Sequence, residues 1–193
     1  ASAPGPDGMH PRVLKECSLE LSLPLAMIFQ KSLDDGALPS EWKQTNVCPV
    51  FKKGKKDDPK NFRPINLASV PAKVMEQILK DNVQEHLTTH QLISKSQHGF
   101  VPGRSCTSNL LEHMNNVTRA LDSGQNFDTI LLDFKRAFDK VPFRHMLAKV
   151  KSHGIGGRVL KWIEDWTRGR KQRVVLNGEH SSLIDVTSSV VQG

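Results

Sequence analysis

The chain has 193 residues, 37% of them hydrophobic and 24% charged, which is enough for one ordinary hydrophobic core in a soluble globular protein. Its longest apolar stretch, Leu21 to Phe29, is interrupted by Pro24 and is too short to span a bilayer, and its three widely spaced cysteines favour neither a disulfide framework nor a zinc site. The net charge of +7 favours a polyanionic partner. The cysteine usage predicts an intracellular protein, and the short apolar stretch predicts no membrane contact.

Helical spacing of apolar residues predicts a first helix from Val13 to Leu33. A short strand follows from Thr45 to Phe51, and the lysine-rich stretch after it reads as a turn. A further helix is expected to begin near Ser69. The apolar face of that helix consists of Val74, Met75, Ile78, Val83 and Leu87.

The middle of the chain predicts a loop at Gly99 to Gly103 and then a helix over Thr107 to Leu121. The residues expected to face inward from this helix are Leu110, Leu111, Met114, Val117 and Leu121. Thr129 to Phe134 is predicted to be a strand, and its nearly continuous apolar run places it inside a sheet rather than at an edge.

The last third predicts two helices, near Phe143–Ser152 and Arg158–Trp166. A hairpin is then expected from Gln172–Leu176, an Asn-Gly turn and the strand-like Ser182–Thr187. Helices that precede and interrupt strands in this way are typical of the α+β class.

Asp133 lies at the end of the predicted buried strand, with Phe138 and Asp139 close behind it. A buried strand is a rigid mount, and carboxylates at strand ends are suitable oxygen ligands for Mg²⁺. The alternative is ordinary turn chemistry, in which the aspartates cap the next element. The residues alone leave both readings open.

This segment is one of several blocks that follow one another in a fixed order. They are Val47–Lys56, Asn61–Leu67, Gln97–Ser105, Asp128–Asp139, Arg170–Gly178 and Val191–Gly193. Over the whole chain this series resembles the reverse transcriptase of non-LTR (LINE-type) retrotransposons, most closely the jockey and chicken-repeat lineages. The resemblance implies an incomplete right-hand polymerase, with fingers and the first part of the palm. Residues 1–193 would form one partial reverse transcriptase domain, in which about 1–120 are the N-terminal extension, fingers and supporting helices and about 121–193 begin the palm.

The resemblance implies that Asp133 is the first catalytic metal ligand and that the backbone carbonyl of Phe134 is its companion. The family's cofactor is a pair of Mg²⁺ ions, for which Mn²⁺ can substitute. Asp139 is expected to cap the element behind it. The family's later pair of adjacent aspartates does not follow in this chain, which reads as a fragment that is inactive on its own.

For the incoming nucleotide, the resemblance implies that Arg63 and either Lys52 or Lys53 contact the triphosphate. Phe138 would be the steric gate against ribonucleotides, and Gln192 would reach the sugar. The side chains implied for template and primer binding are Arg104, Arg170 and Lys171. The partners are accordingly an RNA template, a DNA primer and dNTPs, and the family analogy places the protein in the nucleus.

Other functions stay open at this point. The missing aspartate pair, together with Val191 where the family has proline, also fits a non-catalytic nucleic-acid-binding remnant or a host-adapted interaction protein. The spacing of Asp133 and Asp139 also matches a loose pattern of RNA-dependent RNA polymerases, which ranks below the retroelement because of the other blocks. The sequence does not indicate an oligomeric state.

Overall fold

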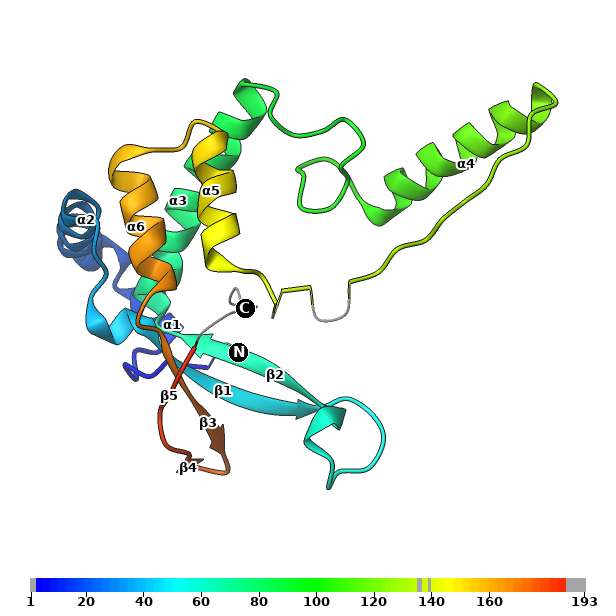
Figure 1. The fold of residues 1–193 in the computed structure, drawn as a ribbon. Helices are drawn as coiled ribbons and strands as arrows, with labels where there is room; N and C mark the ends of the chain where they lie inside the picture. Colours follow the sequence, from blue (N-terminus) through cyan, green and yellow to red (C-terminus); the bar gives the residue numbers. More distant parts are fainter. Residues whose placement is uncertain (1–2, 135–136, 139, 187–193) are drawn as a thin grey trace. The chain divides into compact units, whose positions relative to one another are not determined.

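The computed structural model describes residues 3–134, 137–138 and 140–186 (Figure 1). Two compact units make up the chain. The stretch Gln84–Lys135 forms one unit, and the residues on either side of it in the sequence form the other, larger unit. The expectations that Gln192 reaches the nucleotide sugar and that Asp139 caps the element behind it concern residues outside the described ones.

The larger unit begins with α1 (Pro11–Glu16) and α2 (Ser18–Asp35). These two helices confirm the predicted Val13–Leu33 helix, except that it is interrupted at Cys17. The helix α2 ends at Gly36, whose backbone is left-handed with φ 61°, and the Gly36 N–H bonds the last turn. Glycine takes this conformation without the steric cost that a Cβ would impose, which explains why the helix stops there.

A mixed sheet follows, with strand order β2-β1-β3-β4 and β5 also paired with β3 (Figure 1). Its strands are β1 (Gln44–Phe51), β2 (Phe62–Ala68), β3 (Lys171–Leu176), β4 (Glu179–His180) and β5 (Ile184–Asp185). The short 3₁₀ helices Ser40–Lys43 and Pro59–Asn61 precede β1 and β2. The structure confirms the strand over Thr45–Phe51 and the C-terminal hairpin, whose returning strand is divided into β4 and β5.

The strands β1 and β2 form an antiparallel hairpin, whereas β1 and β3 are parallel and pair Gln44 with Lys171. The Arg173 Nε donates to Asn46 Oδ1 at 2.9 Å and adds a side-chain bond between the two parallel strands. Sequence patterns predicted neither β2 nor this pairing. The β1–β3 contact brings the first and last thirds of the chain into one sheet.

Helices α3 (Val70–Thr89), α5 (Phe143–Ser152) and α6 (Gly157–Thr167) confirm the predicted helices and lie side by side (Figure 1). The core of the larger unit forms around buried Leu38, Met75 and Trp162. The Trp162 Nε1 donates to Ser32 Oγ at 2.9 Å, so that the buried indole has a hydrogen-bond partner on α2. No helix within the described ranges is long and apolar enough to cross a membrane.

The smaller unit contains α4 (Cys106–Asp122), which confirms the helix predicted over Thr107–Leu121. The prediction that its apolar residues face inward is wrong, because four of the five are exposed. These are Leu110, Leu111, Met114 and Leu121. Helical periodicity marks an apolar face correctly but does not say whether anything in the chain covers that face.

The interior strand predicted over Thr129–Phe134 is also wrong for the described structure. These residues form no strand, and Leu131 is 90% exposed. A fully apolar strand requires hydrogen-bonding neighbours and cover on both faces, and this segment has neither in the described part of the chain. Upstream of it, His113 on α4 stacks edge-on with Phe127 at 5.8 Å between ring centroids.

Candidate nucleotide and nucleic-acid interface

The β1–β2 hairpin carries the predicted triphosphate-binding residues. Val50 pairs with Arg63, and Phe51 pairs with Phe62. The Lys52 N–H then donates to the Asn61 carbonyl at 2.8 Å, which extends the ladder by one residue beyond β1. The hairpin therefore holds the backbone of Lys52 in register with β2.

Alternation along the strand puts Lys52 on the same face as Val50, and therefore on the same face as Arg63, which is the partner of Val50. Lys53 comes one residue later, at the bend that follows the strand. Both Lys52 and Arg63 are exposed. The register thus brings one lysine and one arginine together on an open face, a combination that matches phosphate oxygens.

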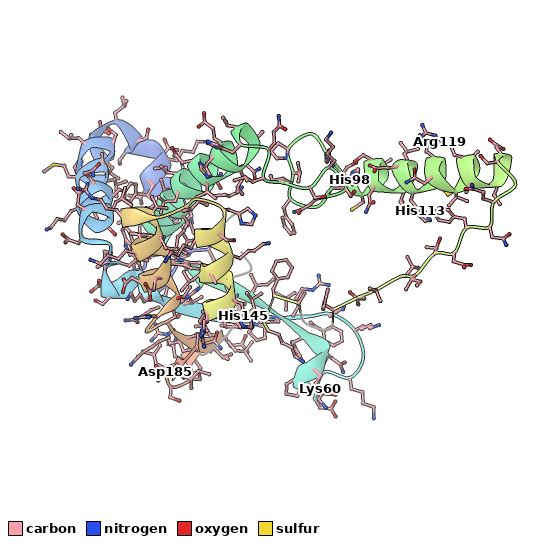
Figure 2. The ribbon with its side chains drawn as sticks, turned by 45° about the horizontal axis from the view of Figure 1, so that its top comes forward. Lys60, His98, His113, Arg119, His145 and Asp185 are labelled. Atoms are coloured by element: carbon pink, nitrogen blue, oxygen red, sulfur yellow. The ribbon has the colours of Figure 1, made fainter. Side chains whose placement is uncertain are left out.

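The opposite face of the hairpin is aromatic. Phe51 and Phe62 meet edge-on with 5.5 Å between ring centroids, and Lys56 Nζ lies 5.7 Å from the Phe51 ring centroid. This cross-strand pair stabilises the hairpin end that carries the basic side chains. Lys60 lies at the same end, in the 3₁₀ helix that precedes β2 (Figure 2).

The turn that joins the two strands depends on Gly54 and Asn61. Gly54 has φ 91°, and a Cβ there would come within 2.6 Å of Asn61 Nδ2. The Asn61 side chain donates to the Lys55 carbonyl at 2.8 Å. Glycine at this position is therefore required both for its backbone conformation and for the close approach of the asparagine.

In the smaller unit, the loop before α4 is anchored by His98 (Figure 2). Its Nδ1 lies 2.8 Å from Ser108 Oγ and its Nε2 lies 2.8 Å from Glu112 Oε2, both on α4. Ser108 and the N-cap Ser105 also form a capping box. Sequence reasoning assigned no role to His98; the signal that the sequence offered was a histidine shortly before the helix start at Ser105.

Arg104, predicted to contact the template backbone, closes this loop. Its Nη1 donates to the carbonyls of Gln97, at 2.8 Å, and Lys95. The side chain is exposed. The Arg104 Nη1 donor therefore holds the loop.

Asp133 lies in the exposed segment of the smaller unit described above, with Phe134 beside it. The described part of the chain groups no three histidine, cysteine or acidic residues in a way that could hold a metal ion. The donor set around Asp133 in the described residues therefore does not by itself form a divalent-metal site. Phe138 belongs to the larger unit, where it is partly exposed in a turn.

Arg170, predicted to contact template or primer, is instead buried, at 7% exposure. Its guanidinium lies 4.7 Å from the Trp166 ring centroid, and Trp166 Nε1 donates to Glu76 Oε1 at 2.6 Å. Burial lowers the pKa of Arg170, and the Glu76 carboxylate opposes this effect. This position favours a structural role, because the guanidinium is not open to a phosphate; its neighbour Lys171 is exposed.

Glu76 on α3 is the acidic member of this cluster, and sequence reasoning missed it. Burial raises the pKa of Glu76, while the Trp166 hydrogen bond and the charges of Arg170 and Lys73 lower it by less. Among the described residues, Arg170 Nη1 is a buried atom without a hydrogen-bond partner. The only available sequence signal was an acid beside Met75 and three residues before Leu79, within the apolar side of α3.

Comparison with known proteins places these features in a family. Residues 52–193 match the family model of the reverse transcriptase (RNA-dependent DNA polymerase). The chain is 27% identical to the RNA-directed DNA polymerase from mobile element jockey of Drosophila funebris, over 99% of this chain and 21% of that protein. It is also 27% identical to the probable RNA-directed DNA polymerase from transposon BS of Drosophila melanogaster, over 77% of this chain and 17% of that protein.

A third relative, the probable RNA-directed DNA polymerase from transposon X-element of Drosophila melanogaster, is 24% identical over 99% of this chain and 21% of that protein. The chain thus spans about a fifth of the length of these relatives. The matched residues include Lys52, strand β2 with Arg63, the His98 loop and Asp133. The chain belongs to the reverse transcriptase family, in the group of non-LTR retrotransposon polymerases to which jockey and the X-element belong.

Proposed function

We propose that this chain is part of an RNA-directed DNA polymerase that binds a dNTP through the β1–β2 hairpin and copies an RNA template onto a DNA primer. One observation carries the proposal: Lys52 and Arg63 share one exposed face of a hairpin whose register is fixed by backbone bonds. In nucleotidyl transfer, charge accumulates on phosphate oxygens, so positioned cations contribute much of the stabilisation. The family match from residue 52 onward supports this assignment.

Each proposed contact has its own chemistry. Arg63 offers a planar fork of donors to two phosphate oxygens, and Lys52 offers a mobile point charge. Phe138 is proposed as the steric gate that excludes a ribose 2′-hydroxyl. Arg104 and Lys171 are proposed as contacts to the backbone of template or primer, where each neutralised phosphate makes binding more salt-dependent.

Asp133 is proposed as one carboxylate of a divalent-metal site. Mg²⁺ prefers carboxylate oxygens, and an exposed aspartate offers them. The described residues gather no group of three histidine, cysteine or acidic side chains that includes it.

The test of the hairpin is equilibrium binding of a fluorescent dNTP to the 193-residue chain. Lys52→Ala and Arg63→Ala should each weaken binding roughly 10- to 100-fold, the effect of removing a hydrogen bond to a charged group. Lys53→Ala is the matched control, because it removes the same charge one residue away and off the shared face. Equal losses for Lys52→Ala and Lys53→Ala would show a diffuse basic surface and contradict the proposed site.

A non-catalytic nucleic-acid-binding role is the second candidate. It is favoured by the absence of a metal-binding group of side chains among the described residues. Primer extension on an RNA template with Mg²⁺ separates the two when it is measured on a longer polymerase that contains this chain and supplies further acidic ligands beside Asp133. Extension that is lost in Asp133→Asn supports the polymerase, whereas RNA binding without extension supports the binding role.

A further inference from the structure

The helix α2 carries apolar residues on two sides, and the larger unit covers one of them. Leu25, Phe29 and Leu33 follow one another at intervals of four residues on the covered side and are partly buried. Phe29 and Leu33 pack against the core around Trp162. Figure 1 shows α2 at the edge of the larger unit, beside α6.

The second apolar side of α2 is open. Leu19, Leu23 and Met27 also follow one another at intervals of four residues, and they are 85%, 70% and 66% exposed. Leu23 and Leu25 are two residues apart, which corresponds to about 200° around a helix, so the open face lies away from the covered one. A helix with apolar residues on opposite sides is typical of one that is covered on both.

A shallow hollow in the open face has the pattern that receives a side chain from another helix. It is lined by Ala26, Met27, Gln30, Lys31 and Asp34. Four of these residues, from Met27 onward, stand at positions i, i+3, i+4 and i+7. In paired helices, four neighbouring side chains of this kind form the hole into which one apolar side chain of the facing helix inserts. The open face therefore offers both leucines that can insert and a hole that can accept one.

The charges beside the open face favour one direction of pairing between two copies of α2. Glu20 lies toward the N-terminal end of the face and Lys31 toward its C-terminal end, and both are exposed. Parallel packing about a two-fold axis would bring Glu20 to Glu20 and Lys31 to Lys31. Antiparallel packing instead brings each Glu20 near the Lys31 of the other copy, which is the complementary arrangement. An antiparallel axis near position 25 also puts Leu23 opposite Met27 and Leu19 over the hollow.

The acidic residues next to Lys31 have partners within the chain. Asp34 pairs with Arg158 on α6, and Asp35 pairs with Lys31 at 2.9 Å. The Lys31 ammonium has three N–H donors, so its bond to Asp35 leaves two for a carboxylate of a second copy.

We infer that the open face of α2 binds the same face of a second copy of this chain, with the two helices antiparallel and related by a two-fold axis. Each copy then supplies both an inserted leucine and the hole that receives one, which is how a two-fold interface closes on itself. The inference goes beyond the proposed function and does not depend on it. Because each copy contributes one helix face, the interface is small and its Kd is expected to be weaker than about 1 μM.

Sedimentation equilibrium of the 193-residue chain tests this contact, over concentrations from micromolar to several hundred micromolar. The mean mass should rise with concentration from that of one chain toward that of two and no further. Leu23→Glu should raise the Kd more than about 100-fold, because each copy loses a buried leucine and two like charges meet near the axis. Ser22→Glu is the matched control, since it adds the same charge at an exposed position one residue away and off the open face, and it should leave the Kd unchanged.

A charge exchange tests the direction of the helices. Glu20→Lys and Lys31→Glu should each raise the Kd roughly 2- to 30-fold, because two exposed ion pairs are lost in every dimer. The double variant should restore the wild-type Kd, since the exchanged charges again meet opposite ones. Failure of the double variant to restore it would overturn the antiparallel arrangement.

Circular dichroism melting of each variant identifies a folding defect, and the charge exchange gives an independent reading if Leu23→Glu is unfolded. A wild-type mass that stays at one chain over the whole range would overturn the inference and leave the open face to a different protein or to another segment of a longer chain. A dimer whose Kd is the same in Leu23→Glu would also overturn it, because the contact would then use another surface. Growth beyond two chains would do so as well, since it would show general apolar association.

These outcomes are separate from those of the dNTP-binding test, so either proposal can fail without the other.

Discussion

The His98 Nε2 and the Glu112 Oε2 lie 2.8 Å apart and join the loop before α4 to the helix itself. An ionised carboxylate only accepts hydrogen bonds, so Nε2 carries the proton of this pair. We expect Glu112→Ala to free the loop, because it leaves a buried imidazole N–H without its partner. Amide hydrogen exchange from Gln97 to Ser105 should accelerate about 5-fold, which corresponds to roughly 1 kcal/mol.

Asn116→Ala is the control for this measurement. Asn116 is exposed on α4, one helical turn after Glu112, and its replacement should leave exchange in the loop unchanged. Unchanged loop exchange in Glu112→Ala would show that the hydrogen bond does not hold the loop.

The raised pKa of Glu76 predicts how stability depends on pH. A carboxyl whose pKa is higher in the folded chain than in the unfolded chain contributes stability below its unfolded pKa and loses it as pH rises through the folded pKa. Glu76→Gln keeps an oxygen that can accept the Trp166 N–H and removes the titration. The free energy of unfolding of Glu76→Gln, relative to wild type, should therefore increase from pH 4 to pH 7.

Urea unfolding at several pH values measures this difference. Glu85→Gln provides the control, because it removes one carboxyl at an exposed position of the same helix. A Glu76→Gln profile parallel to that of wild type would show that burial does not govern the Glu76 carboxyl.

The buried bond between Trp162 and Ser32 links α6 to α2. Trp162→Phe and Ser32→Ala should each destabilise the fold by roughly 1–3 kcal/mol. Ser32→Ala leaves the buried indole N–H without a partner, and Trp162→Phe removes one of the two hydrogen bonds of the Ser32 hydroxyl, which also donates to the Ala37 carbonyl. The double variant should cost less than the sum of the two, with a coupling energy of about 1 kcal/mol by urea unfolding. Trp162→Phe with Ser22→Ala, at an exposed α2 position, should be additive.

The helices could be predicted from sequence because their signals are local. Apolar periodicity and end signals lie within one element, and α5 begins and ends at the predicted residues. The β1–β3 pairing could not be predicted, because it joins residues 127 positions apart and neither strand encodes its neighbour. The Thr129–Phe134 prediction failed for a related reason. An apolar segment becomes an interior strand only where other segments pair with it and bury it, and the segment's own sequence does not identify those neighbours.

The residues of the candidate site could likewise be predicted only in part. Lys52 and Arg63 were identified from their motifs, and the register of β1 and β2 gave the reason to prefer Lys52 over Lys53. Arg170 was assigned to nucleic acid from the resemblance, and only the structure shows that it is buried and packed on Trp166. Charged side chains are mostly exposed, so the sequence does not single out the one that is buried.

The parallel pairing of β1 with β3 also imposes an order on folding during synthesis. At about 5–20 residues per second, a ribosome needs roughly 6–25 seconds between Gln44 and Lys171, whereas β2 follows β1 directly. The nascent chain can therefore close the hairpin that carries Lys52 and Arg63 long before its other neighbour exists. Throughout that interval one edge of β1 has unpaired backbone groups that can pair with strands of other chains. Chaperone binding would therefore matter most before Lys171 leaves the exit tunnel.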